Sequence, residues 1–200
     1  MNGGRGQPAC FLWRSQHAAL DAAQNVPDIQ RQYDWPCSLE EVMHTEFRKA
    51  EPASEMRSLL AFDRKAFLAS DRFPADYWRE LESYWMLIDG VKVGCCAFEK
   101  NVDFHEDGEL TRRKGSLYVA TTGILPRFRG LGFGTMLKYW EICYARRHRF
   151  GRIVTNMRAS NTAIIQLNKK LGFKRVRTTA HYYTDPEEST VVMELLLPSQ

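Results

Sequence analysis

Long apolar runs are absent from this 200-residue chain. Its first residues, Met1 to Pro8, carry glycine and proline and lack the apolar core of a secretory signal. No later run reaches the length that a helix needs to cross a bilayer. These absences argue against a membrane-spanning or secreted protein, so we expect a cytoplasmic protein with no membrane partner.

Cysteine and histidine are few and scattered. The five cysteines have neither the spacing of a metal site nor a secretory context that would favour disulfides. The five histidines also lie apart from one another. We therefore expect reduced thiols and no bound metal.

A strong charge of one sign is lacking too. The net charge of +4 and the pI near 8.8 are mild, and the basic residues are dispersed. The densest basic run, Arg146 to Arg149, stands near the end of a predicted helix, where cations complement the helix dipole. This pattern argues against nucleic acid as a partner, whereas a mild positive charge suits an anionic cofactor.

What the chain does have is enough apolar sequence for one domain. Hydrophobic residues make up 44% of it, which suits a compact domain with some additional chain. We interpret residues 1–40 as a partly flexible N-terminal extension and residues 41–200 as the domain. Three roles stay open for the extension: it covers the domain, it contacts a second subunit in a homodimer, or it remains loose.

Periodicity and turn residues predict the elements of this domain. Asp89-Gly90 between two apolar runs predicts a β-hairpin, while Pro52 and Gly172 mark a helix start and a helix end. The predicted strands are 43–50, 85–88, 91–98, 116–125, 152–157, 173–184 and 190–197; the predicted helices are 14–23, 52–69, 73–81, 131–149 and 161–171, and 101–115 is a predicted polar loop. This order predicts an α/β (mixed α+β) fold, with a mixed, mostly antiparallel sheet of about seven strands and helices on both faces.

The strongest chemical signal is a glycine turn between the strand at 116–125 and the helix at 131–149. It runs Arg129-Gly130-Leu131-Gly132-Phe133-Gly134. Glycines let the backbone turn tightly and approach a ligand closely, and a helix N-terminus offers unpaired N–H groups and a positive dipole end. Arg129 adds a positive charge. The turn therefore predicts a site for a phosphate or pyrophosphate group.

Two common phosphate-binding turns do not match this segment. A Walker loop needs a Gly-Lys pair, which is missing here. A dinucleotide fingerprint needs G-x-G-x-x-G and an acid about 20 residues later, whereas this turn runs G-x-G-x-G and residues 152–158 contain no acid. On these residues alone, a glycine turn without any ligand stays open.

A second motif narrows the alternatives. Asn161-x-Ala163 is followed by Leu167-Asn168-Lys169-Lys170-Leu171-Gly172-Phe173. Together with Ile124-x-Pro126-x-x-Arg129-Gly130-x-Gly132-x-Gly134, in this order and spacing, it resembles the GCN5-related N-acetyltransferase (GNAT) family over about residues 43 to 197.

The resemblance implies a GNAT-like acyl-CoA acyltransferase fold with acetyl-CoA as the co-substrate and no metal. It implies an N-acetyltransferase in which a primary amine, of a small molecule or a protein, attacks the thioester directly in a ternary complex. The alternative is a non-catalytic acyl-CoA-binding or sensor domain of the same fold.

The resemblance also implies roles for individual residues. The strand before the turn would be bulged and pair with the pantetheine amides, the turn would cradle the pyrophosphate, and Asn161 would bind the pantetheine arm while capping its own helix. The implied cofactor-binding residues are Ile124, Leu125, Arg129, Gly130, Leu131, Gly132, Phe133, Gly134, Thr135, Asn161 and Asn168.

The catalytic groups are less clearly marked. Many family members carry a proton-donating Tyr where this chain has Asn168, and often a Glu on the strand that here spans 116–125 without a carboxylate. Tyr182 and Tyr183 are the candidate acids, as is Tyr118, and solvent is an alternative. The preferred base is Glu99, because we expect it to end a strand next to the site. The other candidate bases are Asp103, His105, Glu106, Glu109 and His181.

Overall fold

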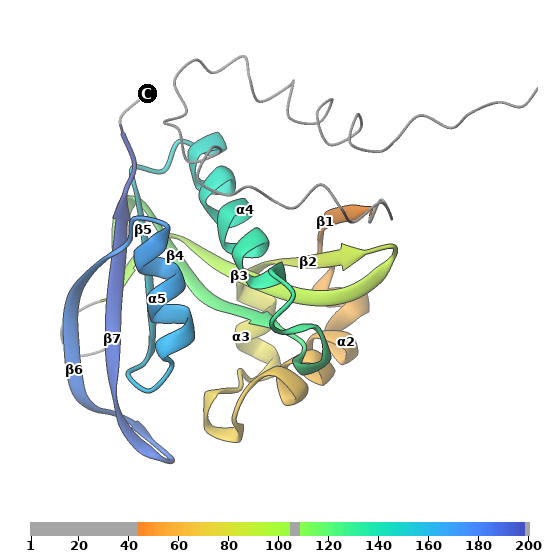
Figure 1. The fold of residues 1–200 in the computed structure, drawn as a ribbon, viewed down its shortest axis with the longest axis horizontal. Coiled ribbons are helices and arrows are strands. Elements are labelled where there is room, and N and C mark those ends of the chain that lie inside the picture. Colours follow the sequence, from red (N-terminus) through yellow and green to blue (C-terminus); the bar gives the residue numbers. More distant parts are fainter. Residues whose placement is uncertain (1–43, 105–108, 199–200) are drawn as a thin grey trace, which may run out of the picture.

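Turns and caps set the boundaries of the elements in residues 44–104 and 109–198, the parts of the chain that the computed structural model describes (Figure 1). The strands are β1 (Thr45–Lys49), β2 (Glu82–Ile88), β3 (Val91–Phe104), β4 (Leu110–Ile124), β5 (Arg152–Arg158), β6 (Lys174–Thr184) and β7 (Glu187–Leu196). The helices are α2 (Pro52–Ala66), α3 (Ala75–Glu80), α4 (Phe133–Arg147) and α5 (Thr162–Lys170), with short 3-10 turns at Ala69–Asp71 and Pro126–Phe128.

The strands form one sheet in the order β1-β2-β3-β4-β5-β7-β6. Five neighbouring pairs are antiparallel, and only β4 and β5 run parallel. The predicted order of elements and the mixed, mostly antiparallel sheet are therefore confirmed. The hairpin turn at Asp89 and Gly90, with φ values of +49° and +77°, also forms as its sequence predicts.

Helices cover both faces of this sheet, as predicted. Figure 1 shows α4 and α5 in front of the sheet and α2 and α3 behind it. Phe98 and Leu137 belong to the core under α4, whereas Trp78 and Trp85 belong to the core under α2 and α3. Each of these four side chains is fully buried, so each face has its own apolar layer.

The predicted polar loop at 101–115 is wrong, because β3 continues to Phe104 and β4 begins at Leu110. These segments pair with each other beyond the end of β2, so much of their surface faces solvent and shows little apolar alternation. Ion pairs hold them instead: Asp103 binds Arg113 at 2.8 Å and also Arg152. A strand without a covered face gives no periodic apolar signal.

The N-terminal extension, the helix at 14–23, His105 and Glu106 lie outside the described residues. Within the described ranges, no helix is long and apolar enough to span a membrane. The same ranges contain no group of three or more His, Cys, Asp or Glu side chains that could hold a metal ion.

Candidate active site

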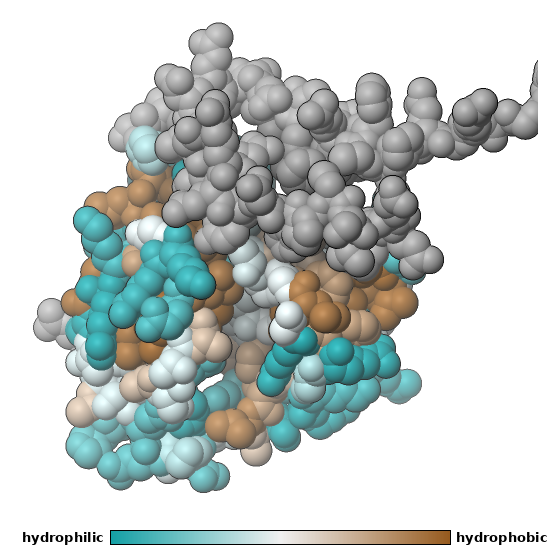
Figure 2. Space-filling model, viewed as in Figure 1, coloured by the Kyte–Doolittle hydropathy of each residue, from teal (hydrophilic) through white to brown (hydrophobic). Residues whose placement is uncertain are grey.

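A cleft opens where β4 and β5 diverge. The two strands pair only as far as Val119 and Thr155; beyond that point β4 stays with β3 as far as Ile124, and β5 stays with β7 as far as Arg158. The cavity between them has a volume of about 400 Å³ and is lined from both faces of the sheet. Figure 2 shows the surface hollowed between the half that carries α5, β6 and β7 and the half that carries α2 and α3.

The glycine turn lies at the N-terminus of α4, as its sequence predicts. Gly130 and Gly132 take positive φ values of +78° and +84°, which glycine adopts without strain. Gly132 caps the helix, which therefore begins at Phe133 rather than at Leu131. The backbone N–H groups of residues 130–134 donate to no acceptor among the described residues, so they remain available to an anionic group.

Arg129 braces this turn instead of standing free at its mouth. Its Nε donates to the Ile124 carbonyl at 3.0 Å, and its Nη2 donates to the Ala66 carbonyl at 2.8 Å. The side chain thus joins the end of α2 to the end of β4. Its charge still lies beside the turn, but its hydrogen bonds are to the protein backbone.

The edge of β4 that faces the cleft has free backbone groups. Leu125 donates its N–H to the Val93 carbonyl at 2.9 Å. We expected this N–H to be available to the cofactor, but in the structure it is already used within the sheet. Backbone groups alternate sides along a strand, so those of Thr122 and Ile124 point away from β3, although the Ile124 carbonyl already accepts from Arg129. Of these two residues, Thr122 lines the cleft. Ala120 is an extra residue in the β3–β4 register, so the strand is bulged, as predicted.

Asn161 and Asn168 occupy different environments. Asn161 lines the cleft, and its Oδ1 accepts from the Ile164 N–H at 3.4 Å as the N-cap of α5. Asn168 is fully buried, and its amide lies against the sulfur atoms of Met157 and Met193. Because its side chain faces the core, the predicted cofactor contact of Asn168 is wrong for this arrangement.

Three tyrosines line the cleft on the face opposite α4. Tyr118 donates to Asn156 Oδ1 at 2.6 Å, and the rings of Tyr182 and Tyr183 meet edge to face. Burial raises the pKa of Tyr118 and of Tyr182, and it raises the pKa of Tyr183 to about 12. These phenols therefore stay protonated at neutral pH. The Tyr118 hydroxyl is already donated to Asn156, whereas Tyr182 and Tyr183 can donate hydrogen bonds to a substrate.

Glu99 does not reach the cleft. It lies inside the long strand β3 rather than at its end, and its carboxylate accepts a hydrogen bond from Tyr77. It lines a neighbouring cavity of about 420 Å³ instead. We expected Glu99 to act as the base because it would end a strand next to the site, and neither condition holds in the structure. Asp103 and His181 do not line the cleft either.

Two ion pairs, each with at least one residue in the cleft lining, were not predicted from the sequence. Arg158, at the end of β5, binds Asp71 after α2 with Nη2 2.7 Å from Oδ1. Lys138 and Glu141 form a buried ion pair on α4. Residues that are 87 positions apart leave no local signal. Lys138 and Glu141, by contrast, are opposite charges at helical spacing among the largely apolar residues before the last turn of α4.

A divided sheet, with a helix N-terminus at one face and tyrosines at the other, agrees with the acyltransferase fold that the sequence resembles. The model of the acetyltransferase (GNAT) family matches residues 38–173. The chain belongs to this family, and it is an acyltransferase that moves an acetyl group to an amine. The sensor alternative is not favoured.

Individual relatives agree with this assignment. The chain is 28% identical over 120 residues to an N-alpha-acetyltransferase of Sulfurisphaera tokodaii, covering 58% of this chain and 72% of the relative. Its fold matches the ribosomal-protein-S18-alanine N-acetyltransferase of Escherichia coli, with a TM-score of 0.65 and 15% identity over 78% of this chain and 96% of that one. It also matches Arabidopsis thaliana Naa50 in complex with the bisubstrate analogue CoA-Ac-MVNAL, with a TM-score of 0.62 and 19% identity over 76% and 99% of the two chains.

Proposed function

We propose that this protein transfers the acetyl group of acetyl-CoA to the α-amine at the N-terminus of a polypeptide. The donor enters from the α4 face and the acceptor from the face that carries α2, α3 and the β6–β7 hairpin. The observation that carries the proposal is the link between Arg158 and Asp71, which narrows the acceptor side of the cleft.

The donor site fits the groups that are free at the α4 face. The N–H groups of residues 130–134 suit the pyrophosphate, because they converge at the positive end of the helix dipole. The backbone groups of Thr122 and the N–H of Ile124, which point away from β3, suit the amides of the pantetheine arm, and Asn161 also lines the cleft. When bound, acetyl-CoA supplies the activated acetyl group.

The acceptor side is enclosed by two loops. Arg158 donates to Asp71 on one loop and to the carbonyls of Asp185 and Pro186 on the other. A lysine side chain projects from the middle of a polypeptide, so its chain must leave the site in two directions. The polypeptide that follows an N-terminal amine leaves the site in only one direction. A cleft that is closed on one side of its entrance therefore suits an N-terminus better than a lysine.

The titratable groups of the cleft favour the same acceptor. Asp71 is the only carboxylate among the described lining residues, and it is already paired with Arg158. An enzyme with no free carboxylate base depends on amine that is already neutral. At pH 7.5 about a third of an α-amine is neutral, against roughly 0.1% of a lysine amine.

The chemistry requires one bond to form and one to break. The amine nitrogen attacks the thioester carbon, the C–S bond breaks, and the sulfur leaves with the electron pair. The cleft orients the acceptor, with the protonated phenols of Tyr182 and Tyr183 as hydrogen-bonding groups and the Tyr118 hydroxyl held by Asn156. A backbone N–H on the β4 edge is the group that we expect to stabilise the negative charge that develops on the carbonyl oxygen.

A peptide pair tests the acceptor class. One peptide has a free N-terminus and no lysine, and the other has the same sequence with a blocked N-terminus and one lysine. We expect kcat/KM with acetyl-CoA to be at least about tenfold higher for the free N-terminus, with the acetyl group mapped there by mass spectrometry. Equal or faster acetylation of the lysine peptide, or of small amines alone, overturns the proposal.

A further inference from the structure

A buried ion pair lies on α4 beside the cleft. Lys138 Nζ is 2.8 Å from Glu141 Oε2, and both side chains are 1% exposed. Thr122 donates its hydroxyl to the other oxygen of Glu141 at 2.6 Å. The three side chains therefore connect α4 to the part of β4 that has separated from β5.

Stability alone does not account for this pair. Replacing a buried ion pair by apolar residues of similar volume is often neutral or stabilising, because burying two charges is costly. Burial raises the pKa of Glu141, which shows how unfavourable the site is for a charged carboxylate, although Lys138 and Thr122 oppose the shift. Cys96 on β3 is the other titratable group close to the pair, and burial raises the pKa of its thiol too.

The position of Lys138 relates it to the donor. Lys138 and Thr122 both line the cleft, and Lys138 is the only titratable lining residue that belongs to α4, the helix whose N-terminus faces the proposed pyrophosphate site. The other titratable residues lining the cleft are Asp71, Arg72, Tyr118, Arg158, Tyr182 and Tyr183. They come from the strands and from the loops on the acceptor side.

The reaction needs a proton at this face. A thiolate leaves when the C–S bond breaks, and a nearby cation stabilises it and can return a proton to it. Asn168, at the position where many relatives carry a tyrosine, has no transferable proton at neutral pH and faces the core. The proton donor at the α4 face therefore has to come from another element.

We propose that the Lys138 ammonium, held by Glu141, faces the donor sulfur and gives its proton to the CoA thiolate as the C–S bond breaks. The nitrogen lone pair of the acceptor forms the new N–C bond, the C–S electron pair stays on sulfur, and sulfur takes the proton from Lys138. Lys138 is then reprotonated from water, and the acceptor nitrogen releases its own proton to water. This assignment rests on the donor placement proposed above and not on the acceptor class.

The thiol of bound CoA reports on Lys138 without any turnover. The ultraviolet absorbance of its thiolate is titrated in complexes of CoA with the wild-type protein and with K138M/E141L, in which both charges are removed together. Subtracting the same titration with desulfo-CoA, which lacks the thiol, removes the signal of the protein cysteines. We expect the bound thiol to titrate about one pH unit or more lower in the wild type, because an ammonium nearby favours the thiolate.

Kinetics separate this role from a structural one. In K138M/E141L we expect the unfolding midpoint to be maintained and the KM for acetyl-CoA to change less than about threefold, while kcat falls about 100-fold. K138R keeps a positive charge but has no proton to transfer at neutral pH, so its bound thiol stays acidic while kcat remains low.

Two results overturn the proposal. One is a bound thiol that titrates at the same pH in K138M/E141L as in the wild type. The other is a K138R enzyme with the kcat of the wild type, and this result overturns the proposal even where the double variant does not fold. A wrong placement of the donor gives a different result from a wrong role for Lys138. In that case the wild-type protein binds neither CoA nor desulfo-CoA at the N-terminus of α4, and both proposals are overturned.

Discussion

Arg158 donates to both carboxylate oxygens of Asp71, with Nη2 2.7 Å from Oδ1 and Nε 2.8 Å from Oδ2. The same guanidinium reaches the carbonyls of Asp185 and Pro186, and it stacks over the ring of Tyr183. Arg158 is only 7% exposed. One side chain at the end of β5 therefore fastens the turn after α2 to the β6–β7 hairpin.

Arg158→Lys is expected to loosen this connection and relax acceptor choice. A lysine cannot form the paired hydrogen bonds to Asp71 and still reach both carbonyls, because it lacks the planar fork of donors. The preference for a free N-terminus over a lysine, measured as a ratio of kcat/KM values on the two matched peptides, should fall about tenfold or more. Affinity for CoA should stay within about threefold of the wild type.

Arg152→Lys is the matched control for that experiment. Arg152 also bridges two carboxylates, Asp103 and Glu194, but it lies outside the cleft lining. The same substitution there should leave the peptide preference unchanged. An equal loss of preference in both variants would mean that general loosening of the sheet, and not the link to Asp71, sets acceptor choice.

Gly130→Ala is expected to weaken CoA binding, and Gly90→Ala provides a close control. Both glycines have nearly the same positive φ, +78° and +77°, and a Cβ at either meets no atom within 4 Å. Both substitutions should therefore cost about 1 kcal/mol of stability through backbone strain. Only at Gly130 would the new methyl group and the altered turn face the pyrophosphate, so calorimetry should show CoA affinity reduced about tenfold or more for that variant alone.

The order of elements was predictable because it depends on local signals. Pro52 opens α2, Gly172 follows the end of α5, and the Asp89-Gly90 turn fixes the register of the hairpin. Each of these residues restricts or frees the backbone by its own chemistry, whatever it packs against. The glycine turn belongs to the same class, which explains why the sequence predicts its place at the N-terminus of α4.

The catalytic residues are harder to predict from the sequence, because their positions depend on contacts between distant segments. The pattern around Asn168 matches a family motif, but whether that side chain faces the cleft or the core depends on the packing of α5 against Met157 and Met193. Glu99 was misplaced because the exposed hairpin formed by β3 and β4 has no apolar period to mark its length. Sequence patterns predict which face of an element is buried, but they do not predict which polar side chains contact one another.

Gly94→Ala is expected to disturb the cleft edge of β4 from the neighbouring strand. A Cβ at Gly94 would lie 2.6 Å from the Ile124 side chain and 2.9 Å from the carbonyl oxygen of Gly123. Relief of this overlap should cost about 1–3 kcal/mol of unfolding free energy and shift Ile124, so the KM for acetyl-CoA should also rise. Urea unfolding and steady-state kinetics measure the two effects.

Gly151→Ala controls for the loss of a glycine near the sheet. Its Cβ would meet no atom within 4 Å, and Gly151 has no positive φ. Stability and KM should both stay close to the wild-type values. A Gly94→Ala protein as stable as this control would show that β4 absorbs the extra atom without strain.

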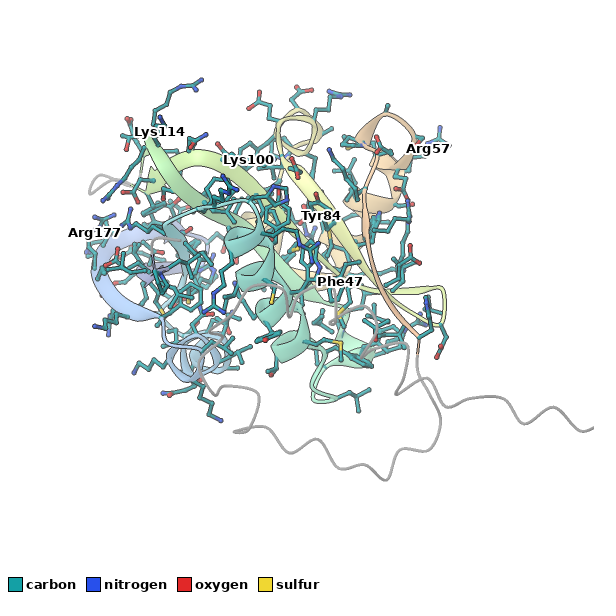
Figure 3. All side chains as sticks on the ribbon, turned by 90° about the horizontal axis from the view of Figure 1, so that it is seen from above. Phe47, Arg57, Tyr84, Lys100, Lys114 and Arg177 are labelled. Atoms are coloured by element: carbon teal, nitrogen blue, oxygen red, sulfur yellow. The ribbon has the colours of Figure 1, made fainter. Side chains whose placement is uncertain are left out.

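Glu82 is expected to make folding stability depend on acid pH. Its Oε2 lies 2.6 Å from Lys100 Nζ, and its Oε1 accepts hydrogen bonds from Tyr144 at 2.6 Å and Tyr84 at 2.7 Å. Burial alone would raise the pKa of Glu82, but these three partners outweigh it and lower the pKa to about 2. Figure 3 labels Tyr84 and Lys100 near α4, so the carboxylate joins β2, β3 and that helix.

The direction of this pH dependence follows from the lowered pKa of Glu82 in the folded protein. The carboxylate contributes its full stabilisation above its ordinary pKa of 4.5, and loses it progressively as the pH falls toward 2. Glu82→Gln should therefore be less stable than the wild type at pH 7, with a difference that shrinks between about pH 5 and pH 3 in urea unfolding. Glu46→Gln, which removes an exposed carboxylate from β1, should change stability by less than about 0.5 kcal/mol at each pH. A difference for Glu82→Gln that stays constant from pH 7 to pH 3 would contradict the proposed network, because a carboxylate that is lost on protonation cannot stabilise the fold equally at both ends of that range.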